Sequence, residues 1–320
     1  MKKLRTSIPS RIFDILLYCF VYLAARLMKK MRNLGLNRYP LCKRALFNVG
    51  IFPIRDHYYE PLFHPRHITR SLSLDRMLPG IDWNHDGQLS LLAEFRWGKE
   101  LIDIPTSKVE ELSFHLNNNA FESGDAEFWY NLIRLKKPRR IIEVGSGYST
   151  LMAINALNKN KEENPDYECR HICIEPYEMP WLEKTPVSVI RKKVEDVNID
   201  VFRDLKENDV LFIDSSHMIR PQGDVLFEFL QLLPSLRAGV IVHVHDIFSP
   251  KDYPQQWVLD EVCFWNEQYL LEAFLTSNRD WKIIGALNYL HHNRYEKLKE
   301  HCIFLSPERE PGSFYIQKIK

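Results

Sequence analysis

Acidic and histidine side chains follow two short apolar runs of the sequence. The run VLFI is followed at once by Asp214 and, three residues later, by His217. The run IVHV is followed by His245 and Asp246. A histidine with a pKa near neutrality can act as a general base, and paired carboxylates are oxygen ligands for a divalent ion. The spacing therefore predicts proton transfer or metal binding where these two runs end.

The sequence leaves two mechanisms open at this place. His217 is the first choice as general base, with His245 and Asp246 as further catalytic candidates. His243 lies two residues before His245 in the same run, and we expect it only to support that neighbour. In the other mechanism Asp214 and Asp246 bind Mg²⁺, which would lower the pKa of a hydroxyl and orient it. A third metal ligand is not evident from the sequence.

A glycine-rich turn, EVGSGYST, follows an apolar run nearer the middle of the chain. Gly145 and Gly147 let the backbone turn tightly and approach a ligand closely. A dinucleotide-binding turn would place a third small residue where Thr150 stands. Glu143, just before the glycines, would repel a pyrophosphate and tolerate a cationic ligand. The turn therefore favours a positively charged ligand.

Short apolar runs alternate with helix-length amphipathic stretches from the glycine turn onward. This alternation is typical of βαβ units, in which helices cover both faces of a parallel sheet. Ligands of such sheets bind beyond the carboxyl ends of the strands, so the turn, the acids and the histidines are expected in one crevice. Strands are predicted near 140–144, 170–175, 187–191, 209–214, 239–244, 281–286 and 313–318, and helices near 107–118 and 124–136.

With these motifs in order, the sequence resembles the class I S-adenosylmethionine (SAM)-dependent methyltransferases, whose first motif is an acidic residue, a spacer and Gly-x-Gly. The resemblance covers about residues 125–320, including FIDSSHM at 212–218, VHVHDIFSPKDYP at 242–254 and PGSFYI at 311–316. These segments look like a bacterial branch that contains small-molecule and sugar O-methyltransferases. RDHYYEPLF and ICIEPYEMPWL look like an uncharacterised subgroup of it.

The resemblance implies a Rossmann-like α/β fold, with a doubly wound seven-stranded sheet, mostly parallel, an antiparallel C-terminal strand and an N-terminal helical and irregular extension. It also implies SAM as cofactor, with Glu143 and the turn around its methionine part and Glu175 accepting both ribose hydroxyls. Glu195 and Asp196 match the region near the adenine. The expected cofactor residues are Glu143, Gly145, Ser146, Gly147, Tyr148, Glu175, Glu195, Asp196 and Asp214.

The expected reaction is O-methylation of a saccharide or another small-molecule or cell-surface precursor. Polar and aromatic side chains that stack on sugar or aryl rings are the candidates for the acceptor site. Phe264, Trp265 and Tyr269 stand at helical spacing and are expected to be core residues. The acceptor candidates are Arg220, Tyr253, Trp257, His57, Tyr58 and Tyr59.

The N-terminal end of the chain is strongly basic. The first 50 residues hold eleven Lys or Arg and one acid, a local charge of +10, although the whole chain carries +1. Asp14 and Arg26 interrupt the apolar stretch from Ile12 to Met28, so its uncharged core is shorter than the roughly 20 residues of a spanning helix. We expect a helix within residues 1–35 to lie on the anionic inner face of a membrane. A helix packed on the protein's own body and a true span are the alternatives.

The amino-acid composition excludes several classes of protein. With 45% hydrophobic and 27% charged residues, the chain is neither disordered nor collagen-like nor a coiled coil. Six cysteines without CxxC spacing favour a reduced, cytoplasmic setting, and Cys169, His171 and Cys173 are expected in a buried strand. Prolines and aromatics predict an irregular segment over 40–105. The expected domains are residues 1–35, 36–120 and 121–320.

Two other functions fit parts of the pattern. An NAD(P)-dependent oxidoreductase shares the sheet and the acidic ribose ligand, but Thr150 and Glu143 count against it. A membrane-attached binding protein could have kept the fold and lost turnover, although Glu175 and Asp214 are both retained. A related branch of the fold resembles iron-dependent hydroxylases of antibiotic pathways. No nucleic-acid partner is expected.

Overall fold

The computed structural model describes residues 8–320, with side chains from Ile12 onward. The chain divides into two compact units, Met1–Arg70 and Ser71–Lys320. The first unit contains helices α1 (Ile8–Leu34) and α2 (Pro40–Val49) and a long irregular segment. Among residues 12–70 only Leu36 is buried, so this unit has almost no core of its own.

The second unit is built on a seven-stranded sheet with the order β3-β2-β1-β4-β5-β7-β6. All neighbouring strands run parallel except β7, which is antiparallel to both β5 and β6. The predicted fold class is confirmed, and every predicted strand is present. The strands are β1 (Arg140–Val144), β2 (Arg170–Ile174), β3 (Ser188–Ile190), β4 (Val210–Ile213), β5 (Ile241–Val244), β6 (Trp281–Ala286) and β7 (Phe314–Lys318).

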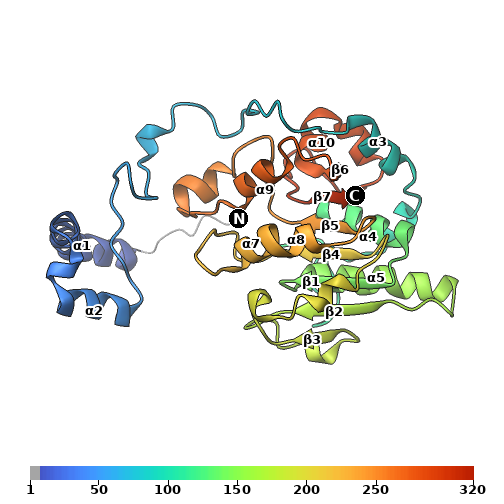
Figure 1. Ribbon diagram of the computed structural model, residues 1–320, viewed down its shortest axis with the longest axis horizontal. Coiled ribbons are helices and arrows are strands. Elements are labelled where there is room, and N and C mark those ends of the chain that lie inside the picture. Colours follow the sequence, from blue (N-terminus) through green and yellow to red (C-terminus); the bar gives the residue numbers. More distant parts are fainter. Residues whose placement is uncertain (1–7) are drawn as a thin grey trace. The chain divides into compact units, whose positions relative to one another are not determined.

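Helices cover both faces of the sheet (Figure 1). One face packs against α4, α5 and α10, and the other packs against α6 to α9. Alternate residues of β1 follow this division, because Ile141 belongs to the first core and Ile142 to the second. The helices of this unit are α3 (His85–Ala93), α4 (Asp125–Lys136), α5 (Tyr148–Glu163), α6 (Asp200–Arg203), α7 (Asp224–Phe227), α8 (Leu233–Ser235), α9 (Glu267–Leu275), α10 (Leu287–Asn293) and α11 (Tyr295–Lys299).

The helix predicted over 107–118 is wrong. Phe114 and Leu116 are both buried there, and the backbone N–H of Leu116 donates to Pro105 O. The Asn118 side chain accepts hydrogen bonds from the backbone of Ala120 and Phe121. Such side-chain bonds offer the backbone an alternative to helix.

The segment predicted as irregular, 40–105, is wrong in two places, because it contains α2 and α3. Leu91, Leu92 and Phe95 of this segment lie in the same core as α4 and α5. The core of the second unit therefore includes residues before 121.

Candidate active site

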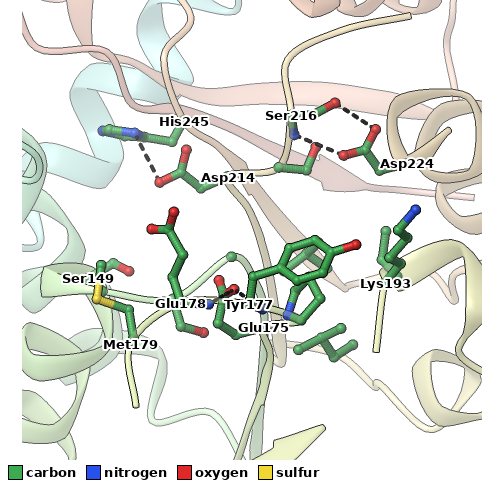
Figure 2. A pocket seen from close by; sticks show the side chains of 18 of the residues that line it. Ser149, Glu175, Tyr177, Glu178, Met179, Lys193, Asp214, Ser216, Asp224 and His245 are labelled. Atoms are coloured by element: carbon green, nitrogen blue, oxygen red, sulfur yellow. Dashed lines mark hydrogen bonds and ion pairs between the residues drawn. The ribbon is translucent and has the colours of Figure 1, made fainter. Parts of the chain in front are cut away.

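A cavity of about 570 Å³ opens at the carboxyl ends of β1, β2 and β4, next to the glycine turn. Its wall includes the turn residues, the acid that ends β2 and the acid that ends β4. Figure 2 shows Asp214 and His245 side by side at one part of this wall, with Ser216 and Asp224 paired at another. The predicted site residues on the wall are Gly145, Ser146, Gly147, Tyr148, Glu175, Glu195, Asp214, Arg220 and His245.

The two glycines of the turn have different structural roles. Gly145 has φ +77°, and a Cβ there would lie 2.0 Å from the backbone oxygen of Asp214. Any side chain at this position would therefore push β1 and β4 apart. Gly147 is extended, and a Cβ would meet only the Met179 side chain, at 3.8 Å. Gly147 is therefore free of packing constraints and leaves room in the cavity.

Glu143 does not line the cavity, and the expectation that it contacts the cofactor is corrected here. Its carboxylate is fully buried and accepts hydrogen bonds from the Ser149 and Thr150 hydroxyls, at 2.9 and 2.8 Å. The other carboxylate oxygen lies 2.6 Å from His171 Nε2. Glu143 points from β1 toward α5, so it supports the glycine turn from behind.

The Glu143–His171 pair is an ion pair inside the sheet. Burial alone would lower the pKa of His171, but hydrogen bonds with Cys173 and Glu143 raise it to about 10. His171 is therefore an imidazolium at neutral pH. As expected, His171 and Cys173 are buried in β2, where Cys169 lies just outside the strand.

Glu175 faces the cavity from the end of β2. One of its carboxylate oxygens, Oε1, accepts both the Tyr177 and the Glu178 backbone N–H groups, at 3.0 and 2.9 Å. These bonds fix the carboxylate and leave Oε2 for a ligand. Of the two residues expected near an adenine, Glu195 lines the cavity, whereas Asp196 is exposed to solvent and does not. The predicted contact of Asp196 with the adenine therefore has no support from the cavity and stays a prediction.

Two histidines and two acids meet where β4 and β5 end. His217 Nε2 lies 3.3 Å from Asp214 Oδ1 and 3.6 Å from Asp246 Oδ2. His245 Nδ1 lies 3.6 Å from Asp214 Oδ2 and 3.5 Å from Asp246 Oδ1. His217 and Asp246 both have left-handed backbone conformation, with φ +58°, which turns their side chains toward one another. His245 reaches the cavity, whereas His217 and Asp246 stand behind its wall.

The two histidines and the two acids influence one another's pKa values. Burial opposes charge on His217, but hydrogen bonds with Asp214 and Glu267 raise its pKa well above the usual value. Burial likewise opposes charge on His245, yet nearby Asp246 and Asp214 raise its pKa to about 9. Burial also raises the pKa of Asp214, but the neighbouring His245 and His217 outweigh it and lower that pKa. The raised pKa values favour the protonated form of both histidines at neutral pH, so His217 is not a free base in this state. His217 is hydrogen-bonded to Glu267, whereas His245 has only charge contacts with its acidic neighbours.

Three residues that the sequence did not assign to the site complete this region. Glu267 of α9 is fully buried and binds His217 Nδ1 at 2.8 Å, which fixes the imidazole. Trp265, expected to be core, packs on the His217 ring with 4.4 Å between centroids. Asp125 lies 4.0 Å from His245 Nε2. Glu267 could have been suggested only as an acid that faces the strand-end His217. The spacing between Glu267 and His217 in the sequence matches no motif, so no sequence signal identified it.

The expected acceptor residues are dispersed. Arg220 lines the main cavity, whereas Tyr253 is buried beside a smaller cavity of about 220 Å³. Tyr253 accepts a hydrogen bond from the Gln268 backbone and packs against Trp257. Buried Tyr253 is therefore a structural support rather than a wall of the main cavity. His57, Tyr58 and Tyr59 belong to the first unit, and their role in acceptor binding stays a prediction.

His243 lies in β5 beneath His245 and is fully buried. Its ring stacks on Tyr315 at 4.1 Å and meets Phe212 edge-on at 4.5 Å. Burial, followed by the charge of His245, lowers its pKa well below the usual value. His243 is thus a neutral packing residue under the site.

The main cavity has an acidic wall. Lys193 and Arg220 are the only Lys or Arg residues that line it. A wall of this kind attracts a cationic ligand and repels a pyrophosphate. The carboxylates that line it are Glu175, Glu178, Glu195, Asp214 and Asp224.

Comparison with known proteins agrees with this geometry. Residues 142–247, from β1 to just beyond β5, match a family model described as a methyltransferase domain. This segment of the chain is similar to a methyltransferase domain. The family match to this methyltransferase domain includes the glycine turn, Glu175 and both strand-end acid and histidine pairs. The strand order and the antiparallel β7 are those expected for the domain.

A protein of Archaeoglobus fulgidus described as uncharacterized is 29% identical over 171 residues, which cover 49% of this chain and 75% of that protein. Among solved structures, the methyltransferase domain is similar to the O-methyltransferase from Bacillus cereus in complex with SAH, at 14% identity, with 72% and 91% of the two chains covered and a TM-score of 0.38. A putative methyltransferase from Thermobifida fusca gives 14% identity, 78% and 97% coverage and a TM-score of 0.38. TM-scores this low transfer no residue roles.

Proposed function

We propose that the methyltransferase domain transfers the methyl group of SAM to a hydroxyl oxygen of a small acceptor. The acid-rich cavity at the glycine turn carries this proposal, because carboxylates stabilise a sulfonium and disfavour a nicotinamide dinucleotide. Glu175 would hold the ribose through its free oxygen, and Gly147 would give the methionine part room. The methyl group would then face Asp214 and His245.

The protein's main contribution to methyl transfer is alignment. The sulfonium is already an activated donor, and holding the acceptor oxygen in line behind the methyl group can contribute about 7–11 kcal/mol. Asp214, which lines the cavity, would accept a hydrogen bond from the acceptor hydroxyl. As the O–CH3 bond forms and the S–CH3 bond breaks, SAM would become SAH and the hydroxyl proton would leave to water in the cavity. His245, which lies between Asp214 and Asp246, would hold that carboxylate in place.

The donor set behind the cavity also fits a divalent ion. Asp214, His217 and Asp246 each offer one ligand atom, and these atoms lie within 4.8 Å of one another. Together with Asp125 and Glu267 they form a group of four carboxylates, of which Asp214 and Asp246 are partly exposed, and, with His245, two imidazoles. His217 would then be the third ligand, and Glu267 would orient it from the other ring nitrogen.

A bound divalent ion would lower the pKa of the acceptor hydroxyl. Asp214 and Asp246 would contribute oxygen ligands and His217 a nitrogen ligand. A nitrogen ligand suits Mn²⁺ or Zn²⁺ better than Mg²⁺. The raised pKa of His217 counts equally against both roles, because an imidazolium has no lone pair for a proton or for a metal ion, so a bound ion would have to displace the proton on Nε2.

Calorimetry with S-adenosylhomocysteine (SAH) and with NAD⁺ tests the cofactor proposal. We expect SAH to bind in the micromolar range and NAD⁺ to show no heat. Tight NAD⁺ binding without SAH binding would refute a methyltransferase and support the oxidoreductase alternative. Mass spectrometry of ligand released from freshly purified protein gives an independent identification.

A panel of hydroxylated acceptors with isotopically labelled SAM tests the reaction. We expect label on oxygen of a saccharide or related small molecule. EDTA should lower turnover at least about 100-fold, and Mn²⁺ or Mg²⁺ should restore it, if the divalent ion is required. Full turnover after EDTA, together with complete loss in His217→Gln, would instead show that His217 works as a base.

A further inference from the structure

Helix α1 presents an apolar side to solvent along most of its length. Leu16 is 71% exposed and Phe20 77% exposed, although a globular core would bury such side chains. One set of apolar residues recurs at intervals of three and four and shares one side of the helix, whereas Ile12, Ile15 and Val21 are exposed elsewhere on it. The exposed members of this apolar side are Phe13, Leu16, Leu17, Phe20, Leu23 and Leu27.

Cations gather at the C-terminal end of the same helix. Arg26, Lys29 and Lys30 are exposed, and Asp14 is the only acid among residues 8–50. Arg26 donates a hydrogen bond to the Tyr22 hydroxyl at 3.2 Å and lies 5.7 Å from the centre of that ring. By the helical spacing Lys29 lies opposite the apolar side, whereas Arg26 and Lys30 lie at its border. The helix is therefore amphipathic, with an aromatic and cationic border.

Helix α2 repeats this combination within the same unit. Leu41 and Val49 are 75% and 72% exposed, and Lys43 and Arg44 lie between them in the sequence. Of the helices in residues 8–320, none is long and apolar enough to cross a membrane. Residues 12–70 contain one buried side chain and two such helices. Their apolar surface is therefore available to contact a partner.

We infer that the unit formed by residues 1–70 binds the surface of a bilayer containing anionic phospholipid, with α1 lying in the plane of the interface. Charge complementarity selects this partner, because a bilayer offers an apolar layer directly beneath a layer of phosphate. The 27 residues of α1 extend about 40 Å, so its apolar side enters the acyl boundary along several turns while its cations stay at the headgroups. The aromatic rings of Tyr18 and Tyr22 suit the boundary between the two layers.

Flotation of the full-length protein with vesicles tests this inference without any methyl acceptor. The two vesicle types are pure phosphatidylcholine and phosphatidylcholine with 30% phosphatidylglycerol. We expect strong binding only to the anionic vesicles and its loss at high salt. Leu16→Ser and Phe20→Ser should each weaken binding about tenfold or more. Lys29→Gln and Lys30→Gln should each weaken it about fivefold at low salt.

A matched control is Val109→Ser, which removes a side chain with 71% exposure from the second unit. We expect it to leave vesicle binding unchanged. SAH calorimetry on the same proteins separates this inference from the proposed methyl transfer, because Leu16→Ser and Phe20→Ser should bind SAH like the unchanged protein.

Three results would overturn the inference. The first is no flotation with anionic vesicles at low salt. The second is unchanged flotation of Leu16→Ser and Phe20→Ser. The third is a lower melting temperature, or a change from dimer to monomer in sedimentation, for these two variants without vesicle binding, because α1 would then pack on this protein or on a second copy.

Discussion

Replacing Glu175 by Gln tests the cofactor site most directly. In the structure Oε1 of Glu175 accepts two backbone N–H groups, and Oε2 is left for a ligand. A glutamine can keep its amide oxygen on those two donors, so the loop should hold its shape. The amide nitrogen then replaces Oε2 and presents N–H donors where ribose hydroxyls need an acceptor.

The expected loss follows from the kind of hydrogen bond removed. A hydrogen bond to a charged group contributes about 1.5–3 kcal/mol, which corresponds to roughly 10- to 150-fold in affinity. We therefore expect the Kd of Glu175→Gln for SAH, measured by titration calorimetry, to rise by a factor in this range. Asp196→Asn is the matched control, since this exposed acid lies outside the cavity, and its Kd should change less than about twofold.

The melting temperatures of the variants show whether their SAH affinities can be compared with that of the unchanged protein. Glu175→Gln should melt within a few degrees of the unchanged protein, because both backbone bonds persist. An unchanged SAH affinity in a variant of normal stability would refute the ribose contact. An equal loss in Asp196→Asn would show that general charge in this region, rather than one positioned carboxylate, controls binding.

Further substitutions address the turn, the catalytic end and the buried ion pair. Gly145→Ala should lower the free energy of unfolding, measured in urea, by at least about 3 kcal/mol, because its Cβ would collide with the backbone of Asp214. Gly147→Ala should keep the stability of the fold and weaken SAH binding. Equal stability of the two variants would contradict this difference. His217→Gln should lower kcat at least about 100-fold and change the SAH Kd only a few-fold, and an equal loss of both would mark it as structural. His171, whose pKa is raised to about 10, stabilises the fold fully below pH 6.5 and loses this contribution as the pH rises through 10. The free energy of unfolding should therefore fall more steeply from pH 7 to 10 in the unchanged protein than in His171→Gln, and parallel curves would exclude an ion pair with Glu143.

The sheet could be predicted from the sequence because each buried strand is a short apolar run between helical patterns. The strand-end acids and histidines were also predicted together, since parallel strands bring their carboxyl ends to one edge. Side-chain direction was not predictable in the same way. Glu143 precedes the turn but alternates onto the α5 side of β1, where Ser149 and Thr150 hold it. Glu267 was not predicted, because its contact with His217 joins segments 50 residues apart.

The irregular segments show a second limit. Over 107–118 the apolar spacing resembles a helix, yet buried Phe114 and Leu116 and the bonds of Asn118 favour another path. Such competition depends on which surface the segment covers, and that surface is formed by distant residues. The helix α3 was missed for the same reason, since Leu91 and Leu92 gain their burial from packing in the core shared with α4 and α5.

The left-handed backbone at His217 and Asp246 has a consequence for how this protein can vary. A residue with a Cβ in that conformation costs roughly 1–2 kcal/mol, and glycine or asparagine would relieve part of it. A library screened only for thermal tolerance should therefore drift toward Gly or Asn at both positions and abandon the acid and the imidazole. Retention of the two original residues under such screening would reveal that the fold itself relies on them.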